Sequence, residues 1–193
     1  MATLGSQSVG SIVKLNVNGV ATNFIVVHQG LPGTMYDSSC DGTWLLMEDI
    51  YVQRSWDSSD SDYGNSDIHS YLNNTFASLF DSDIKDVIKQ VKIPYTKGKG
   101  YGGSLADGSN GLSAKVFLMS SIEMGYSIYT ANAEGAAVSY FKGSTESKRI
   151  AKFNGKAAMW WLRSPNIQNY SFVFAAGNSG SSTNMDCTRT LGV

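Results

Sequence analysis

Four side chains in this sequence are best suited to nucleophilic or metal chemistry: Cys40, Cys187, His28 and His69. A cysteine nucleophile needs a lowered thiol pKa, a nearby base and a third group that orients the base, and no motif here supplies that arrangement. A structural zinc site needs closely spaced nitrogen and sulfur ligands, and the sequence has no C-x-x-C pair. Two cysteines are too few for a disulfide framework. We therefore expect two reduced thiols, with a single bridge across a long loop as the alternative, and we predict no catalytic residue, metal or cofactor.

A Ser- and Asp-rich run over residues 56–66 carries the densest group of acidic side chains. Asp57, Asp60, Asp62 and Asp67 could coordinate a hard cation, but their spacing does not match an EF-hand loop. We expect a solvated loop whose carboxylates cap local structure. An adventitious cation site is the alternative.

The carboxy-terminal stretch 166–190 is the most informative polar segment. It is rich in Asn, Ser and Thr, and it also contains Tyr170 and Arg189. Antibody binding loops have this composition, because aromatic side chains supply contact area and small polar side chains supply adaptable hydrogen bonds. An ordinary polar hairpin is the alternative. The candidate ligand-binding residues are Asn166, Gln168, Asn169, Tyr170, Ser171, Asn178, Ser179, Ser181, Thr183, Asn184, Asp186 and Arg189.

Two hairpins are expected near the two ends of the chain. Each is predicted by two β-rich runs that flank an Asn-Gly pair, at Asn18-Gly19 and at Asn154-Gly155. Both central positions of such a turn need positive φ, which these residues tolerate. Further extended segments are predicted over 43–47 (as a buried strand), 91–95, 114–119, 170–175 and 183–193.

Helices are expected between these ends. Apolar residues fall at helical spacing from Ile68 to Phe80, after Asn65 or Ser66 as the N-cap, and again over 83–90. The spacing of Ser120 and Glu123 predicts a capping box at a short helix start, which explains this acid without catalysis. The glycine-rich run 97–111 lacks the order of a phosphate-binding loop and is expected to be a surface loop. Helices in the first half and hairpins at both ends predict an α+β fold with two or three short helices.

Composition limits the possible partners. Charged residues make up only 16% of the chain and the net charge is −1, so the basic stripe of a nucleic-acid binder is missing. No apolar run approaches the roughly 20 residues that a membrane helix needs, and the first residues do not resemble a signal peptide. We expect one domain over residues 1–193, made in the cytoplasm, without nucleic acid or membrane insertion.

The run Met159-Trp-Trp-Leu-Arg-Ser-Pro165 is expected to be structural. Trp160 and Trp161 point to opposite faces of a strand, so we expect one to enter the core and the other to cover a neighbouring surface. Arg163 has few acids near it in sequence. We expect its guanidinium to bind loop carbonyls or one buried carboxylate.

The same run carries a family resemblance. Together with Leu191-Gly-Val193, Asn23-Phe-Ile-Val-Val-His-Gln-Gly30, Gly42-Thr-Trp-Leu-Leu-Met47 and Tyr71-Leu-Asn-Asn74, it resembles an uncharacterised domain family of bacteriophages and Gram-positive gut bacteria. Members read W-W-L-R-S-P and later G-V-R-P-A. That pattern is in turn similar to C-type-lectin-like folds, including formylglycine-generating-enzyme-like domains and the variable proteins of diversity-generating retroelements. The resemblance implies one C-type-lectin-like domain. Because this sequence stops at Val193, either it is cut short or something else completes the sheet edge.

The resemblance also implies a function. In the retroelement proteins the region similar to residues 166–190 is the diversified ligand-binding face. We therefore expect a non-enzymatic binding module of a phage or prophage particle that recognises a host cell-surface protein or glycan. The alternative is a structural virion protein, such as a capsid-decoration or fibre-associated protein, whose same face, or the edge left open at Val193, contacts other virion subunits or copies of itself. Both roles place the protein in the virion, and outside the cell after lysis. Formylglycine-generating chemistry is not implied, because it uses a carboxy-terminal cysteine pair and Cys187 stands alone.

Overall fold

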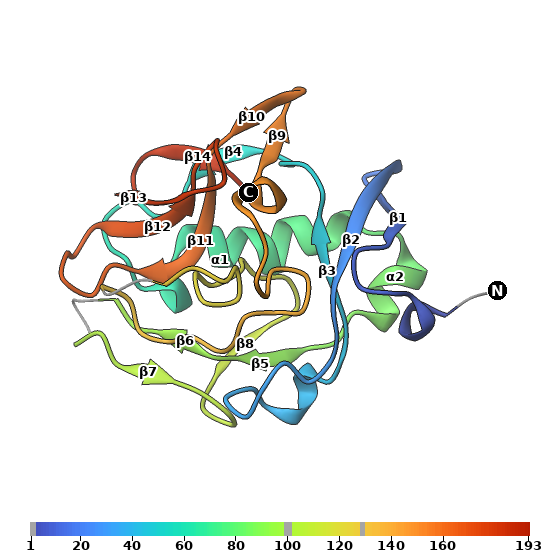
Figure 1. Ribbon diagram of the computed structural model, residues 1–193, viewed down its shortest axis with the longest axis horizontal. Helices are drawn as coiled ribbons and strands as arrows, with labels where there is room; N and C mark the ends of the chain where they lie inside the picture. The colour runs from blue at the N-terminus through green and yellow to red at the C-terminus, as the bar shows by residue number, and fades with distance from the viewer. Residues whose placement is uncertain (1–2, 99–101, 128–129) are drawn as a thin grey trace.

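Sheets from the two ends of the chain lie on either side of a short helical segment (Figure 1). The computed structural model describes residues 3–98, 102–127 and 130–193. Most of the described strands pair antiparallel, and the helices are short. The fold is therefore α+β, as the sequence predicts. None of the helices in these ranges is long and apolar enough to span a membrane.

The amino-terminal sheet contains three antiparallel strands, in the order β1 (Ile12–Val17), β2 (Val20–Gly30) and β3 (Gly42–Met47). The predicted hairpin is confirmed, because Asn18 and Gly19 join β1 to β2 with φ angles of 51° and 74°. The strand predicted over 43–47 is also present, but the expectation that it is buried is wrong. It lies at the edge of the sheet, and only Trp44 is buried.

The carboxy-terminal sheet contains five strands, in the order β13 (Ser182–Asp186), β12 (Phe172–Ala176), β11 (Trp160–Pro165), β14 (Thr190–Gly192) and β4 (Gln53–Ser55). Only the β11–β14 pair of this sheet is parallel. The open edge expected at Val193 is not found, because β14 lies between β11 and β4. Strand β4, from the first third of the chain, completes the sheet.

The helical segment predicted from Ile68 to Phe80 is confirmed and begins at the N-cap Ser66, whose hydroxyl accepts a hydrogen bond from the His69 amide. It buries Ile68, Leu72 and Phe76 on one face. Its three parts are α1 (Asp67–Ser70), the π-helical turn Tyr71–Thr75 and the 3-10 turn Phe76–Leu79. The second helix, α2 (Ser82–Val87), is shorter than predicted. Short 3-10 turns cover Leu4–Ser6, Ser38–Cys40, Tyr63–Asn65 and Glu146–Arg149.

Three two-stranded pairs complete the described structure: β5 (Val91–Ile93) with β8 (Leu112–Ala114), β6 (Tyr95–Thr96) with β7 (Leu105–Ala106), and β9 (Ala151–Phe153) with β10 (Lys156–Ala158). The Asn154-Gly155 hairpin is confirmed, with φ angles of 52° and 76°. The strand predicted over 114–119 ends at Ala114. Part of the glycine-rich run, residues 99–101, lies outside the described residues.

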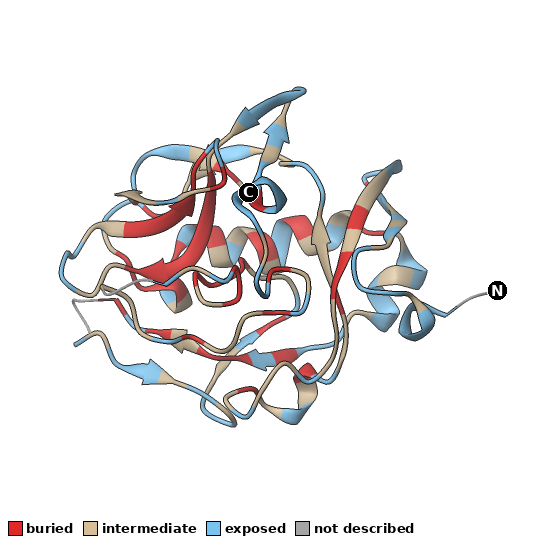
Figure 2. Ribbon diagram, in the orientation of Figure 1, coloured by how far each residue is buried: buried red, intermediate tan, exposed pale blue. Residues whose placement is uncertain are grey.

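Strand β11 is buried along its whole length, and Figure 2 shows β11 and most of β12 in the buried colour. Both tryptophans are buried, so the expectation that one of them covers a surface is wrong. The indole of Trp160 donates to the carbonyl of Arg149, and the indole of Trp161 donates to the carbonyl of Arg54. The sheet is covered on both faces, so each indole finds a carbonyl partner inside the protein.

Candidate functional site

Arg163, the centre of a buried polar network, is fully buried on β11. Its guanidinium forms a bidentate ion pair with Glu123, with nitrogen–oxygen distances of 2.6 and 2.7 Å. It also donates to the carbonyls of Pro94 and Leu118, at 3.1 and 2.7 Å. The sequence left two partners open for this residue, loop carbonyls or a buried carboxylate, and Arg163 binds both. Burial lowers the pKa of Arg163, but attraction to Glu123 and Glu134 more than offsets this, so the guanidinium stays charged.

Glu123 closes the predicted capping box. The amide of Ser120 donates to its carboxylate at 2.8 Å, and its own amide donates to the Ser120 hydroxyl at 3.0 Å. These bonds close a turn rather than a helix. The hydroxyl of Tyr36 also donates to this carboxylate, at 2.8 Å. Glu123 therefore joins the turn to Tyr36 and Arg163.

A second buried carboxylate, Glu134, lies beside the same guanidinium. It accepts hydrogen bonds from the Thr96 amide and the Ser164 hydroxyl. Burial raises the pKa of Glu134 more than Arg163 and these hydrogen bonds lower it. The network thus gives two buried acids different electrostatic surroundings around one arginine.

The segment 115–119 is irregular, and side chains satisfy most of its backbone groups. The side-chain oxygen of Asn73 accepts the amides of Lys115 and Val116, at 2.7 and 3.3 Å. The side-chain nitrogen of Asn73 donates to the Val116 carbonyl at 3.0 Å. Asn73 lies in the π-helical turn, so that turn holds the start of this segment.

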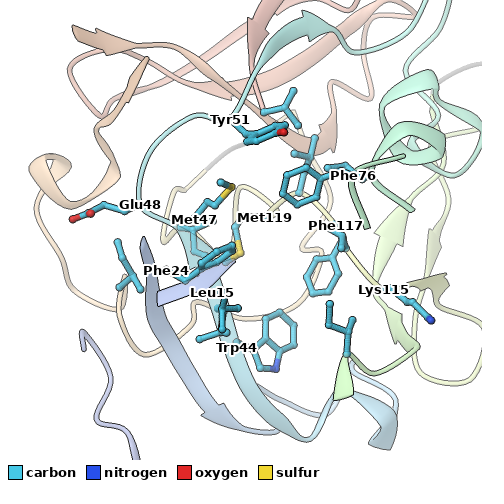
Figure 3. A pocket seen from close by; sticks show the side chains of 18 of the residues that line it. Leu15, Phe24, Trp44, Met47, Glu48, Tyr51, Phe76, Lys115, Phe117 and Met119 are labelled. Atoms are coloured by element: carbon cyan, nitrogen blue, oxygen red, sulfur yellow. The ribbon is translucent and has the colours of Figure 1, made fainter. Parts of the chain in front are cut away.

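The end of the same segment is held by the buried core. The Leu118 amide donates to the hydroxyl of Tyr63 at 2.9 Å, and the Arg163 amide donates to the carbonyl of Met119 at 3.0 Å. These bonds fix the backbone on one side of the segment. The side chains of Phe117 and Met119 project from the other side, toward the amino-terminal sheet (Figure 3).

An apolar cavity of about 420 Å³ lies between this segment and the amino-terminal sheet, and the rings of Phe117 and Trp44 are in contact across it, with centroids 5.3 Å apart. Its size falls within the range of pockets that bind small molecules or peptide side chains. The charged side chains of Glu48 and Lys115 lie at opposite rims and point away from the interior (Figure 3). The labelled apolar lining consists of Leu15, Phe24, Trp44, Met47, Tyr51, Phe76, Phe117 and Met119.

The structure separates the predicted ligand-binding residues into two groups at opposite ends of the β12–β13 pair. Residues 166–171 and 186–189 form one group, because the Cys187 amide donates to the Ser171 carbonyl at 2.7 Å and the Ser171 hydroxyl donates to Asp186 at 3.1 Å. Residues 178–181 form the turn at the other end. The sequence-based prediction therefore combined two groups of residues that the structure places apart. Only strand β13 connects the two groups.

The exposure of these side chains also differs. Tyr170 is 60% exposed, whereas Asn166, Asn169 and Asp186 accept hydrogen bonds from amides two residues later and so hold their own loops. The exposed members are Gln168, Asn169, Tyr170, Asn178, Ser179 and Arg189. The half-buried members are Asn166, Ser171, Ser181, Thr183, Asn184 and Asp186.

The thiols are buried and unpaired with each other, so the alternative of a long disulfide is wrong. Burial raises the pKa of Cys40 and of Cys187 to about 11, which keeps both protonated at neutral pH. The His28 ring bonds to Ser139, and the His69 ring lies 3.2 Å from the Asn73 amide nitrogen. Burial lowers the pKa of both histidines.

The acidic run caps local structure, as expected, but part of it is buried. Asp57 accepts the amides of Ser59, Asp60 and Asp67, and Asp62 accepts the amide of Gly64. Burial raises the pKa of Asp62. Within residues 3–98, 102–127 and 130–193, no group of three or more His, Cys, Asp or Glu side chains is placed to hold a metal ion.

One family profile matches residues 41–193, which is most of the chain, and its description is a domain of unknown function, DUF6273. The chain belongs to this family. No curated protein and no solved structure matches it. The DUF6273 region begins just before β3, so it includes Arg163, the 115–119 segment and one wall of the cavity, while β1 and β2 precede it.

The cavity is the feature that the sequence did not predict. Its lining includes residues of β1, β2, β3, the helical segment and the segment 115–119. These parts are far apart in the sequence, and β1 and β2 come before the DUF6273 match begins. Aromatic and methionine side chains at these positions have the pattern of core residues. The one local signal in the sequence is the apolar run over 43–47, and every residue of this run lines the cavity.

Proposed function

We propose that this DUF6273 protein is a non-enzymatic binding module that recognises a protein or glycan on a cell surface through residues 166–190. The observation that carries the proposal is the loop at Tyr170. This loop is exposed, yet the side chains of Asn166 and Asn169 accept hydrogen bonds from its backbone amides, and the Ser171 hydroxyl donates to Asp186. A loop that is ordered before binding loses little conformational freedom on contact. The resemblance to phage C-type-lectin-like binding proteins supports the same role.

The surroundings of the reactive side chains support a non-enzymatic role. Cys40 and Cys187 are protonated and buried, which disfavours nucleophilic attack. Glu123 is bonded to Arg163, Ser120 and Tyr36 inside the core, where a substrate has no access. These groups are therefore occupied with holding the fold.

A specific observation favours a second candidate, a structural virion protein. Strand β13 is the last strand of the five-stranded sheet, and among the described strands it pairs only with β12. The outer edge of such a strand can pair with another chain. A subunit contact along Ser182–Asp186 would use the same region as the proposed ligand.

Binding of labelled protein to Gram-positive host cells tests the proposal. We expect the double variant Tyr170→Ala/Arg189→Ala to bind at least about tenfold more weakly, because hot-spot contacts of aromatic and arginine side chains dominate interfaces. The matched variant Asn178→Ala/Ser179→Ala changes the opposite end of the β12–β13 pair and is expected to bind like the wild type.

Two results would contradict this expectation. If both variants bind as strongly as the wild type, recognition lies outside the Tyr170 loop. Absence of binding by the folded wild type, together with a defined oligomer in sedimentation, would favour the structural virion role. A Ser182→Pro or Asn184→Pro change on β13 would then be expected to break the oligomer.

A further inference from the structure

The loop that carries Tyr170 is held by a distant segment of the chain as well as by its own side chains. It joins β11 to β12, and the Asn166 amide closes its base by donating to the Phe172 carbonyl at 2.8 Å. The next amide, that of Ile167, donates to the carbonyl of Thr130 at 2.9 Å. The segment around Thr130 therefore helps to shape this loop in the free protein.

A third segment meets the loop at Gly103. The side chain of Asn132 donates to the Gly103 carbonyl at 2.6 Å. A Cβ atom at this glycine would lie 3.3 Å from the side chain of Ile167, so the Gly103 backbone is in close contact with that side chain. Residues of the segments 102–104 and 130–132 therefore lie together beside Ile167.

Glu134 fixes the first of these segments through β6. Its carboxylate accepts the amide of Thr96, which belongs to this strand. Strand β6 pairs with β7, and next to that pair the Lys97 amide donates to the Ser104 carbonyl at 2.9 Å. The backbone that leads to residues 102–104 is therefore bonded to this carboxylate.

The same carboxylate also fixes the start of the Tyr170 loop. It accepts the hydroxyl of Ser164, the residue before the last one of β11. The carbonyl of Glu134 accepts the Ser120 hydroxyl at 2.8 Å, and Glu134 is fully buried. Because residues 130–132 lie only a few positions before Glu134, one buried side chain connects all three segments to the core.

We propose that Glu134 is the positioning residue of the binding surface, and that it sets the shape in which the Tyr170 loop meets its ligand. This inference rests on the proposed function, because it concerns the same surface. A loop that already has its bound shape loses less conformational entropy on binding. Glu134 thus contributes to affinity from inside the protein, without contact with the ligand.

Hydrogen exchange of the free protein tests this positioning role without any ligand. Glu134→Ala removes both bonds to the carboxylate. We expect the Ile167 amide to exchange at least about tenfold faster in this variant, relative to the slowest amides of β12. Glu134→Gln keeps an acceptor for Thr96 and a polar partner for Ser164, so its relative rate is expected to stay within about threefold of the wild type. Val26→Ala, a fully buried change in β2, controls for a general loss of stability and is expected to leave the relative rate unchanged.

Two buried serines keep the test valid if Glu134→Ala does not fold. Ser164→Ala removes one bond to the carboxylate and is expected to speed exchange at Ile167 by about threefold or more. This change also removes the acceptor of the Ser121 amide, so the rate is again compared with β12. Ser121→Ala is the matched control, because its hydroxyl is buried and has no hydrogen-bond partner in the described part of the chain. It is expected to leave exchange at Ile167 unchanged.

Binding to Gram-positive host cells connects the positioning role to the proposed function. We expect Glu134→Ala to bind at least about threefold more weakly, and Glu134→Gln to bind like the wild type. Absence of cell binding by the wild type would overturn the proposed function alone, because exchange in the free protein still decides whether Glu134 positions the loop.

Four results would overturn the positioning role. The first is an unchanged relative rate at Ile167 in folded Glu134→Ala or Ser164→Ala. The second is a rise of the same size in Val26→Ala. The third is a Glu134→Gln variant that exchanges as fast as Glu134→Ala. The last is a Glu134→Ala variant whose Ile167 amide exchanges faster while it binds cells as strongly as the wild type.

Discussion

The two sheets of this protein differ in how completely their apolar strands are buried. Every residue of β11 is buried, and its Arg163 is neutralised by Glu123 within the core. Strand β3 is as apolar, yet only Trp44 of its six residues is buried, and all six line the cavity. The five-stranded sheet also positions one wall of the cavity, because Arg163 on β11 binds the carbonyls of Leu118 and Met119 in the segment 115–119. The difference indicates that the protein is packed more completely around β11 than around β3.

The largest expected effect comes from removing the buried charge of Arg163 in the five-stranded sheet. Arg163→Met leaves the Glu123 carboxylate buried without its partner, which typically costs about 3–5 kcal/mol in the free energy of unfolding. Urea denaturation of the variant measures this loss. Lys14→Met, on the exposed face of β1, is the control and is expected to change stability by less than about 0.5 kcal/mol. A loss below about 1 kcal/mol for Arg163→Met would show that the network does not hold the fold.

A matched pair of leucines compares the packing of the two regions directly. Leu162 is fully buried on β11, so Leu162→Ala is expected to cost about 2–5 kcal/mol. Leu45 is half-buried beside the cavity, so Leu45→Ala is expected to cost about 1 kcal/mol or less. Thermal and urea unfolding of both variants measure the difference. Equal losses would mean that β3 is packed as tightly as β11.

The opposite substitution, from small to large, is expected to sharpen the contrast. Ala175 on β12 has no exposed surface, so Ala175→Leu is expected to cost about 1–3 kcal/mol by overpacking. Leu15 faces the cavity, and Leu15→Phe is expected to change stability by less than about 0.5 kcal/mol because space is present. A large loss for Leu15→Phe would contradict an accessible cavity.

The smallest expected effect is a pH dependence at Glu134. Because burial raises the pKa of Glu134 in the folded protein above its ordinary value of 4.5, ionisation of this acid opposes folding. The stability of the wild type relative to Glu134→Gln is therefore highest below pH 4.5 and falls as the pH rises through that value toward the folded pKa. Urea denaturation of both proteins at a series of pH values measures this difference. A difference that stays constant with pH would show that Glu134 has an ordinary pKa.

Local chemistry predicted much of the fold. The Asn18-Gly19 and Asn154-Gly155 turns, the Ser66 cap and the Ser120–Glu123 box all depend on residues close in sequence, and all are present. The strand predicted over 114–119 ends at Ala114 because the amides of Lys115, Val116 and Leu118 bond to the side chains of Asn73 and Tyr63. No periodicity in the sequence encodes those distant partners.

The candidate sites were less predictable for the same reason. The composition of residues 166–190 indicated polar loops, but only strand pairing decides that Asn178 lies at the end opposite Tyr170. The cavity is lined by residues of β1, β2, β3 and the segment 115–119, which only the folded chain brings together. Arg163 was predictable as an anchor, whereas Glu123 as its partner was not.

The central position of β14 has a consequence for synthesis of the chain. Ser55 pairs with Thr190, and β4 has no other neighbour in the five-stranded sheet. On the ribosome β4 emerges early and waits, because its partner is made after every other described strand. The slowest step of folding is therefore expected to be this long-range closure. Until β14 is inserted, a nascent chain exposes two strand edges: the edge of β11 that pairs with β14, and the edge of β4 that pairs with β14.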